Sequence, residues 1–168
     1  MIKYGYLTSL PRELKWVVAL FTITVSVGFY IGIGYVNETT DANSNGIVEN
    51  YIGNESDELA EVMRFKKSKH EIFSILHTHF LSLSVIFLII SLLLYGVPMN
   101  IRLRKFLILE PLLSVNLTFG GIYFVWLGFE WVSYIVMFSG MLMTVCYSAS
   151  VVLILFGLTK NNINTSQV

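Results

Sequence analysis

The sequence predicts an all-α membrane protein, with four transmembrane helices in an up-down bundle. Of its 168 residues, 55% are hydrophobic, which is more than a soluble domain usually contains. Four apolar runs are each long enough to cross the hydrocarbon core of a bilayer. The charged residues gather between these runs, and the formal net charge is zero. These observations indicate a small integral membrane protein.

The predicted spans belong to one transmembrane domain, residues 1–160, followed by a polar tail, residues 161–168. The four predicted helices cover residues 16–36, 72–95, 106–129 and 131–158. Short turns join the second helix to the third and the third to the fourth, so we expect these neighbours to be antiparallel. A longer polar loop, residues 37–71, joins the first two helices.

This loop divides into two parts. Residues 41–46 are rich in Asp, Asn, Ser and Gly, a composition typical of a turn. From Ser56 to Glu71 there is no helix breaker, apolar residues recur at helical spacing, and Ser56 or Asp57 is suited to cap the start. We therefore predict a short amphipathic helix here, near the membrane surface, or a direct extension of the second membrane helix.

Lysine and arginine are distributed unevenly along the chain. The N-terminal segment, the turn at 96–105 and Lys160 hold seven of them, whereas the loop at 37–71 holds four. Because basic residues favour the cytoplasmic side, we expect both termini in the cytoplasm and the loop outside, in a bacterial inner membrane. No basic face is free of acidic residues, which argues against nucleic acid as a partner.

The second predicted helix combines an apolar composition with two histidines and four serines. Helical positions seven apart lie nearly on one line, and such a line of mainly polar residues runs along this helix. We call it the histidine seam, and its members are His70, Ser74, His77, Leu81, Ser84, Leu88 and Ser91. Polar side chains in a bilayer seek partners, so we expect the seam inside the bundle or against another chain.

A haem or metal site is one interpretation of these histidines. His77 and His79 are the candidate ligands, but they point about 200° apart on a helix and do not bind one atom together. A second ligand would come from Met137 or Met141 of the last helix, at a comparable depth, or from a partner chain. Haem b is the candidate cofactor. The single cysteine, Cys146, excludes a disulfide framework within the chain.

A proton or polar path is a second interpretation. Glu110 lies within the third predicted helix, and a carboxyl group inside a membrane is costly unless it is paired or protonated. Asn116, Ser84 and Ser91 lie between Glu110 and the depth of His77. These side chains are the candidates for such a path.

Glycines mark candidate contacts between helices. Gly28 and Gly32 form a GxxxG spacing in the first predicted helix, and Gly120 and Gly121 form a pair in the third. Small residues at such positions let another helix approach closely. We therefore expect these four glycines to face neighbouring helices.

These patterns favour an accessory or structural subunit of a larger membrane complex, with a respiratory complex as the candidate. The polar loop is too short for a catalytic domain, so we expect no catalytic activity of the chain's own. Its expected partners are membrane lipids and other membrane subunits or further copies of itself. Two alternatives stay open: a haem- or metal-binding redox protein of electron transport that uses His77, and a proton-coupled carrier that acts as an oligomer.

Overall fold

The computed structural model describes residues 5–55 and 62–159, and these residues form helices and connecting segments with no strand. A short 3-10 helix, η1 (Tyr6–Ser9), precedes the first long helix. The α-helices are α1 (Arg12–Thr40), α2 (Ser44–Ile52), α3 (Lys69–Tyr95), α4 (Ile101–Trp126) and α5 (Val132–Thr159). The predicted tail at 161–168 lies outside the described residues.

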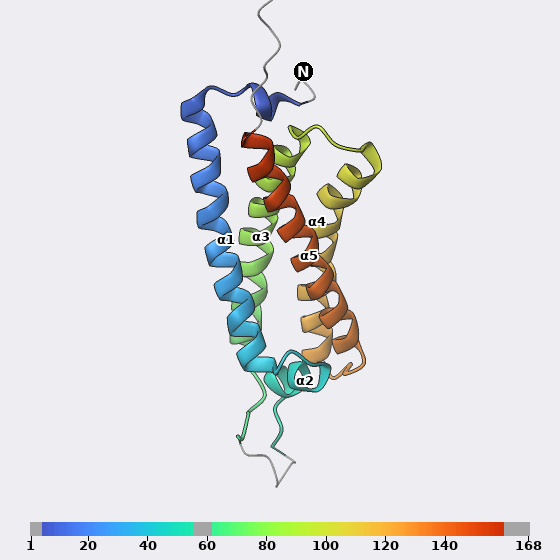
Figure 1. Ribbon diagram of the computed structural model, residues 1–168. Helices are drawn as coiled ribbons and strands as arrows, with labels where there is room; N and C mark the ends of the chain where they lie inside the picture. The colour runs from blue at the N-terminus through green and yellow to red at the C-terminus, as the bar shows by residue number, and fades with distance from the viewer. Residues whose placement is uncertain (1–4, 56–61, 160–168) are drawn as a thin grey trace, which may run out of the picture.

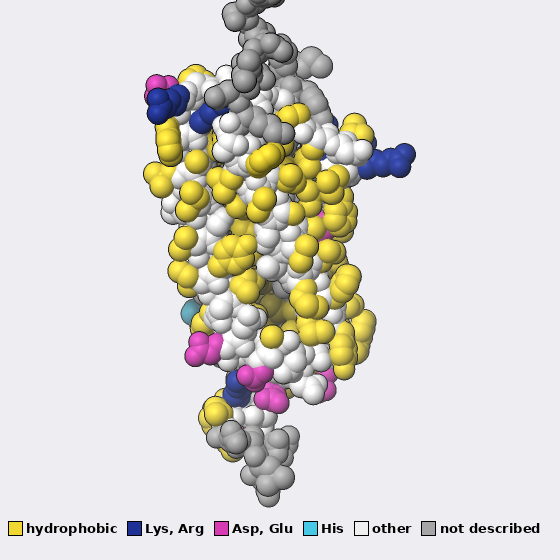
Figure 2. Space-filling model, in the orientation of Figure 1, with side chains coloured by type: hydrophobic (Ala, Val, Ile, Leu, Met, Phe, Trp, Pro, Cys, Tyr) yellow, Lys and Arg dark blue, Asp and Glu magenta, His cyan; other side chains and the backbone are white. Residues whose placement is uncertain are grey.

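Four of these helices, α1, α3, α4 and α5, are long and apolar enough to cross a membrane. They run alternately up and down, with η1 at one end of the bundle and α2 across the other (Figure 1). Hydrophobic side chains cover the middle of the visible surface, and most visible charged side chains lie toward its two ends (Figure 2). The predicted fold class is confirmed.

Local capping explains where the long helices begin and end. The Ser68 hydroxyl accepts a bond from the Glu71 amide and the Glu71 carboxylate accepts one from the Ser68 amide, so this capping box starts α3. The Asn100 side-chain oxygen accepts from the Arg102 amide and caps α4, so α4 begins at Ile101 rather than at Phe106. Gly128 adopts a φ of 105°, which a residue with a side chain rarely does, and so permits the turn into α5.

The core lies where α3, α4 and α5 meet, and α4 contacts both of the others extensively. Its most deeply buried apolar residues include Phe87, Leu94, Val115, Val125, Tyr147 and Ile154. Helix α1 lies against α5 and α2 and exposes most of its apolar side chains. The bundle therefore consists of a packed three-helix unit and a more peripheral α1.

The helix in the outer loop does not lie where the sequence indicated. Among the described residues of the predicted run, residues 62–67 are not helical and α3 begins at Lys69; residues 56–61 lie outside the described chain. The short helix is α2 instead, capped by Asn43, whose side-chain oxygen accepts from the Gly46 amide at 2.8 Å. The Asn54 amide donates to the Arg64 carbonyl and the Lys67 amide donates to the Tyr51 carbonyl. These two bonds pair the segment 62–67 with the end of α2.

Candidate functional site

Polar side chains line the buried interface between α4 and α5. On α4, Glu110, Ser114 and Thr118 follow each other at a spacing of four, which places them on one helical face, and all three are buried. The Thr118 hydroxyl bonds the buried Ser139 hydroxyl of α5 at 2.8 Å. We call Glu110, Ser114, Thr118, Ser139 and Cys146 the interior polar cluster. It is the most strongly polar surface that the bundle buries.

Glu110 is the charged member of the interior polar cluster, and only 6% of it is exposed. Its Oε1 atom accepts a bond from the Ser114 hydroxyl one turn later, and the Cys146 thiol of α5 lies nearby. The Oε2 atom is buried and has no hydrogen-bond partner. Pro111 follows in the same helix and removes one helical donor. A carboxyl group in this setting is a candidate for exchanging a proton.

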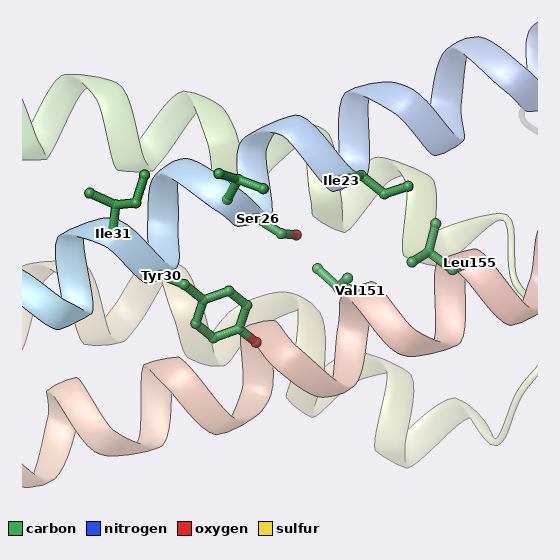
Figure 3. A pocket seen from close by; sticks show the side chains of 7 residues that line it. Ile23, Ser26, Tyr30, Ile31, Val151 and Leu155 are labelled. Atoms are coloured by element: carbon green, nitrogen blue, oxygen red, sulfur yellow. The ribbon is translucent and has the colours of Figure 1, made fainter.

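An apolar groove runs between α1 and α5 and is open at the side of the bundle (Figure 3). Its volume is about 500 Å³, and its lining consists of Ile23, Ser26, Val27, Tyr30, Ile31, Val151 and Leu155. Two hydroxyl pairs join the helices here: Ser26 bonds Tyr147 at 3.0 Å, and Tyr30 bonds Ser148 at 2.7 Å. The two helices thus touch through these pairs and leave the groove beside them open.

The histidine seam faces outward, which excludes the first of its two predicted places, inside the bundle, and leaves the second, against another chain, as a prediction. His77 is exposed, as are Ser74 and Leu81, and only Ser91 of the seam is buried. The inward face of α3 carries Ile72, Phe87, Ile90 and Leu94 instead. No hydrogen bond in the described part of the chain reaches His77. The large apolar side chains, which fill the space against α4 and α5, decided the inward face.

His79 is half-buried, and its contacts explain its position. Its ring stacks on Phe119 of α4, with ring centroids 4.6 Å apart, and its Nδ1 atom bonds the Ile75 carbonyl at 2.8 Å. One ring nitrogen is therefore occupied by its own helix. His79 acts here as a packing residue between α3 and α4.

The two methionines do not complete a site with His77 inside the bundle. Met137 packs against the core, whereas Met141 is exposed on α5. Among the described residues, no three His, Cys, Asp or Glu side chains are grouped closely enough to hold a metal ion. Haem or metal binding by His77, His79, Met137 or Met141 stays a prediction.

The predicted polar path is not continuous. Asn116 is exposed and donates to the Leu112 carbonyl of its own helix, so it does not share the buried face of α4 that carries Glu110, and its part in a path stays a prediction. Ser91 is buried and donates to the Ile108 carbonyl of α4 at 3.2 Å, and Ser84 is half-buried. Glu110 remains inside the bundle, but its polar neighbours come from α4 and α5.

The glycines differ in what lies in front of them. A Cβ atom on Gly121 would lie 2.6 Å from a methyl group of Val136, so α4 and α5 approach closely there, as predicted. A Cβ atom on Gly28, Gly32 or Gly120 would meet nothing within 4 Å. Among the described residues no neighbouring helix therefore comes close in front of these three glycines, and their contact with another helix stays a prediction.

Sequence reasoning missed the pairings that join the helices. Thr118 with Ser139, and Ser26 with Tyr147, are buried hydroxyl pairs between helices. The spacing of four in Glu110, Ser114 and Thr118 was a signal that one face of α4 is polar. The choice of α5 as the opposite surface required the tertiary structure.

The fold and the interior polar cluster define a small integral membrane protein with one transmembrane helical domain. Residues 41–165 match the model of the Aq_1264_TM family, described as a transmembrane helical domain, and the chain belongs to this family. The matched residues contain α2 to α5 and begin after α1. No curated protein and no solved structure matches the chain.

Proposed function

We propose that the protein is a non-catalytic subunit of a larger membrane assembly, which it contacts through the outer face of α3. The observation that carries this proposal is the outward histidine seam. His77 lies eight residues into a membrane-spanning helix, is exposed, and has no hydrogen bond in the described chain. A polar side chain exposed to hydrocarbon is costly, and a helix from another chain supplies the missing partner.

The outer face of α1 supports the same proposal. Gly28 and Gly32 are exposed and have open space in front of them, and large apolar side chains such as Ile31 and Tyr35 flank them. Glycines four apart let a second helix approach closely enough for extensive packing. The chain therefore offers two surfaces to partner helices: the polar histidine seam on α3, and the glycine-containing face of α1.

Photo-crosslinking from the histidine seam tests the proposal. A photoreactive amino acid at Leu81, an exposed member of the seam, should give a discrete protein adduct in native membranes. The matched control is Val152 of α5, which is also exposed and apolar but belongs to neither surface. An adduct of twice the chain's mass identifies a second copy. Lipid adducts alone at Leu81 would contradict the proposal.

Substitutions separate assembly from folding. His77→Leu and Gly32→Leu should each release the chain from the assembly in native gels, because both remove features that face outward. Neither should lower the thermal stability of the isolated bundle, since a Cβ at Gly32 meets nothing within 4 Å. His79→Leu is the control for folding, because its ring packs on Phe119 inside the chain. A loss of bundle stability in His77→Leu would place that residue in the fold.

A further inference from the structure

The Glu110 carboxyl group holds a buried oxygen that the fold leaves without a partner. Oε1 accepts from the Ser114 hydroxyl, but Oε2 has neither solvent nor a hydrogen bond. A buried polar atom usually has a partner, so an unpartnered one requires an explanation. Within a membrane the requirement is stronger, because lipid supplies neither water nor donors.

The side chains around Glu110 are neutral and do not compensate the charge of a carboxylate. From α4 comes the Ser114 hydroxyl, and from α5 the Cys146 thiol. From α3, the Ser91 hydroxyl is directed to the Ile108 carbonyl. The basic residues nearest to Glu110 along α4 are Lys105, which is exposed, and Arg104, whose guanidinium lies 4.7 Å from the ring centroid of Tyr95. No basic side chain in the described part of the chain donates a hydrogen bond to Oε2.

Protonation of Glu110 removes both the uncompensated charge and the unpartnered acceptor. An ionised carboxylate without a cation is unfavourable in a medium of low dielectric constant. Adding a proton removes the charge and turns Oε2 from an acceptor into a donor. The same helix also offers an acceptor: Pro111 has no N–H, so it leaves the carbonyl of Leu107 without its usual helical donor. Leu107 lies one turn before Glu110 and is also buried.

We propose that Glu110 is a proton-binding site inside the membrane, which takes up one proton on Oε2 to become a neutral carboxylic acid and releases it to return to the carboxylate. Ser114 holds the other oxygen in both states, and the Glu-Pro sequence provides the carboxyl group together with the freed carbonyl. This site is independent of the contact with a partner chain proposed above, because it lies between α4 and α5 and not on the outer faces of α1 and α3.

Infrared difference spectra of the purified protein in lipid, recorded during a pH titration, test this site. The C=O stretch of a protonated carboxylic acid should disappear as the pH rises and should be absent in Glu110→Gln. Ser114→Ala and Pro111→Ala should shift the band, since one removes a donor to the carboxyl group and the other restores a competing donor to Leu107. The controls Glu13→Gln and Glu130→Gln replace exposed carboxyl groups and should leave the band unchanged.

Three results would overturn the proposal. One is the absence of a Glu110-dependent acid band at every pH at which the protein is folded. Another is a band that persists at all these pH values, which would make Glu110 a permanent hydrogen-bond donor. The third is a band that NaCl removes at constant pH and choline chloride does not, which would identify a sodium site. If Glu110→Gln does not fold, the shift in Ser114→Ala assigns the band.

Discussion

Helices α1 and α4 are both membrane spans, yet the bundle uses them in opposite ways. In the most apolar window of each, 11% of the residues of α1 are buried, compared with 50% in α4. Helix α4 is nevertheless the least apolar of the four spans. Burial in this protein therefore does not follow hydrophobicity, as it does in a soluble domain.

The properties of lipid explain this difference. Lipid tails are as apolar as leucine, so an apolar face gains little from leaving lipid, whereas hydroxyl pairs and small residues bring helices together. Helix α4 carries Glu110, Ser114, Thr118 and Gly121 on one face, and that face is buried against α5. Helix α1 bonds α5 at Ser26 and Tyr30 and packs Phe29 on Tyr147, and the family match begins after it.

Replacing an isoleucine by alanine on α5 and on α1 should give the largest difference in the free energy of unfolding. Ile154→Ala on α5 removes a fully buried side chain and leaves a cavity, which should lower the free energy of unfolding by about 2 kcal/mol. Ile31→Ala on α1 removes a side chain that is 69% exposed and should change it by less than about 0.5 kcal/mol. Reversible unfolding in mixed micelles measures both. Equal losses would mean that α1 is packed as tightly as α5.

Two adjacent glycines sharpen the comparison within α4. Gly121→Leu forces a side chain into Val136 and should destabilise the bundle by about 1–3 kcal/mol. Gly120→Leu is the matched control, because a Cβ there meets nothing within 4 Å, and it should have little effect on unfolding in the same assay. If Gly120→Leu lowers the free energy of unfolding more than Gly121→Leu does, α4 does not approach α5 closely at Gly121.

The pH dependence of stability tests whether α2 belongs with the packed unit, since α2 contacts α4 and α5 as well as α1. Burial, and to a lesser extent Tyr35, raise the pKa of Tyr51 from 10.0 to about 12. The unfolded chain ionises first, so this contribution to stability is complete below pH 10 and is lost as the pH rises toward 12. Thermal melts of Tyr51→Phe should lack this loss, and Tyr134→Phe, an exposed control, should keep it.

Loss of a single hydroxyl pair should give the smallest change in the free energy of unfolding. Thr118→Val removes the bond to Ser139 and should cost about 0.6 kcal/mol, a typical value for a hydrogen bond between membrane helices. Ser139→Ala in the Thr118→Val background should then cost less than it does alone, which a double-mutant cycle of unfolding free energies measures. Ser82→Ala is the control, because that exposed hydroxyl bonds only the Thr78 carbonyl of its own helix. Strict additivity would show that the pair contributes nothing.

The sequence by itself determined the number, type and approximate ends of the membrane spans. In lipid every backbone polar group must be satisfied within the segment, so a long apolar run has to be helical. The caps Ser68 and Asn100 were not predicted, and Asn100 sets the start of α4 inside the basic turn, five residues before the predicted start. The presence of a buried carboxyl group at Glu110 followed from its place in an apolar run.

Only the tertiary structure decided which face of each helix points inward. Helical periodicity identified a polar line on α3 and another on α4, but it does not say which line meets a neighbour. The line on α4 is inside because Thr118 finds Ser139, whereas the line through His77 is outside because Phe87 and Leu94 fill the space against the core. The position of α2 depended likewise on long-range contacts of the loop, such as that between Asn54 and Arg64. Inward faces and loop pairings arise from contacts between distant residues, and local pattern does not contain them.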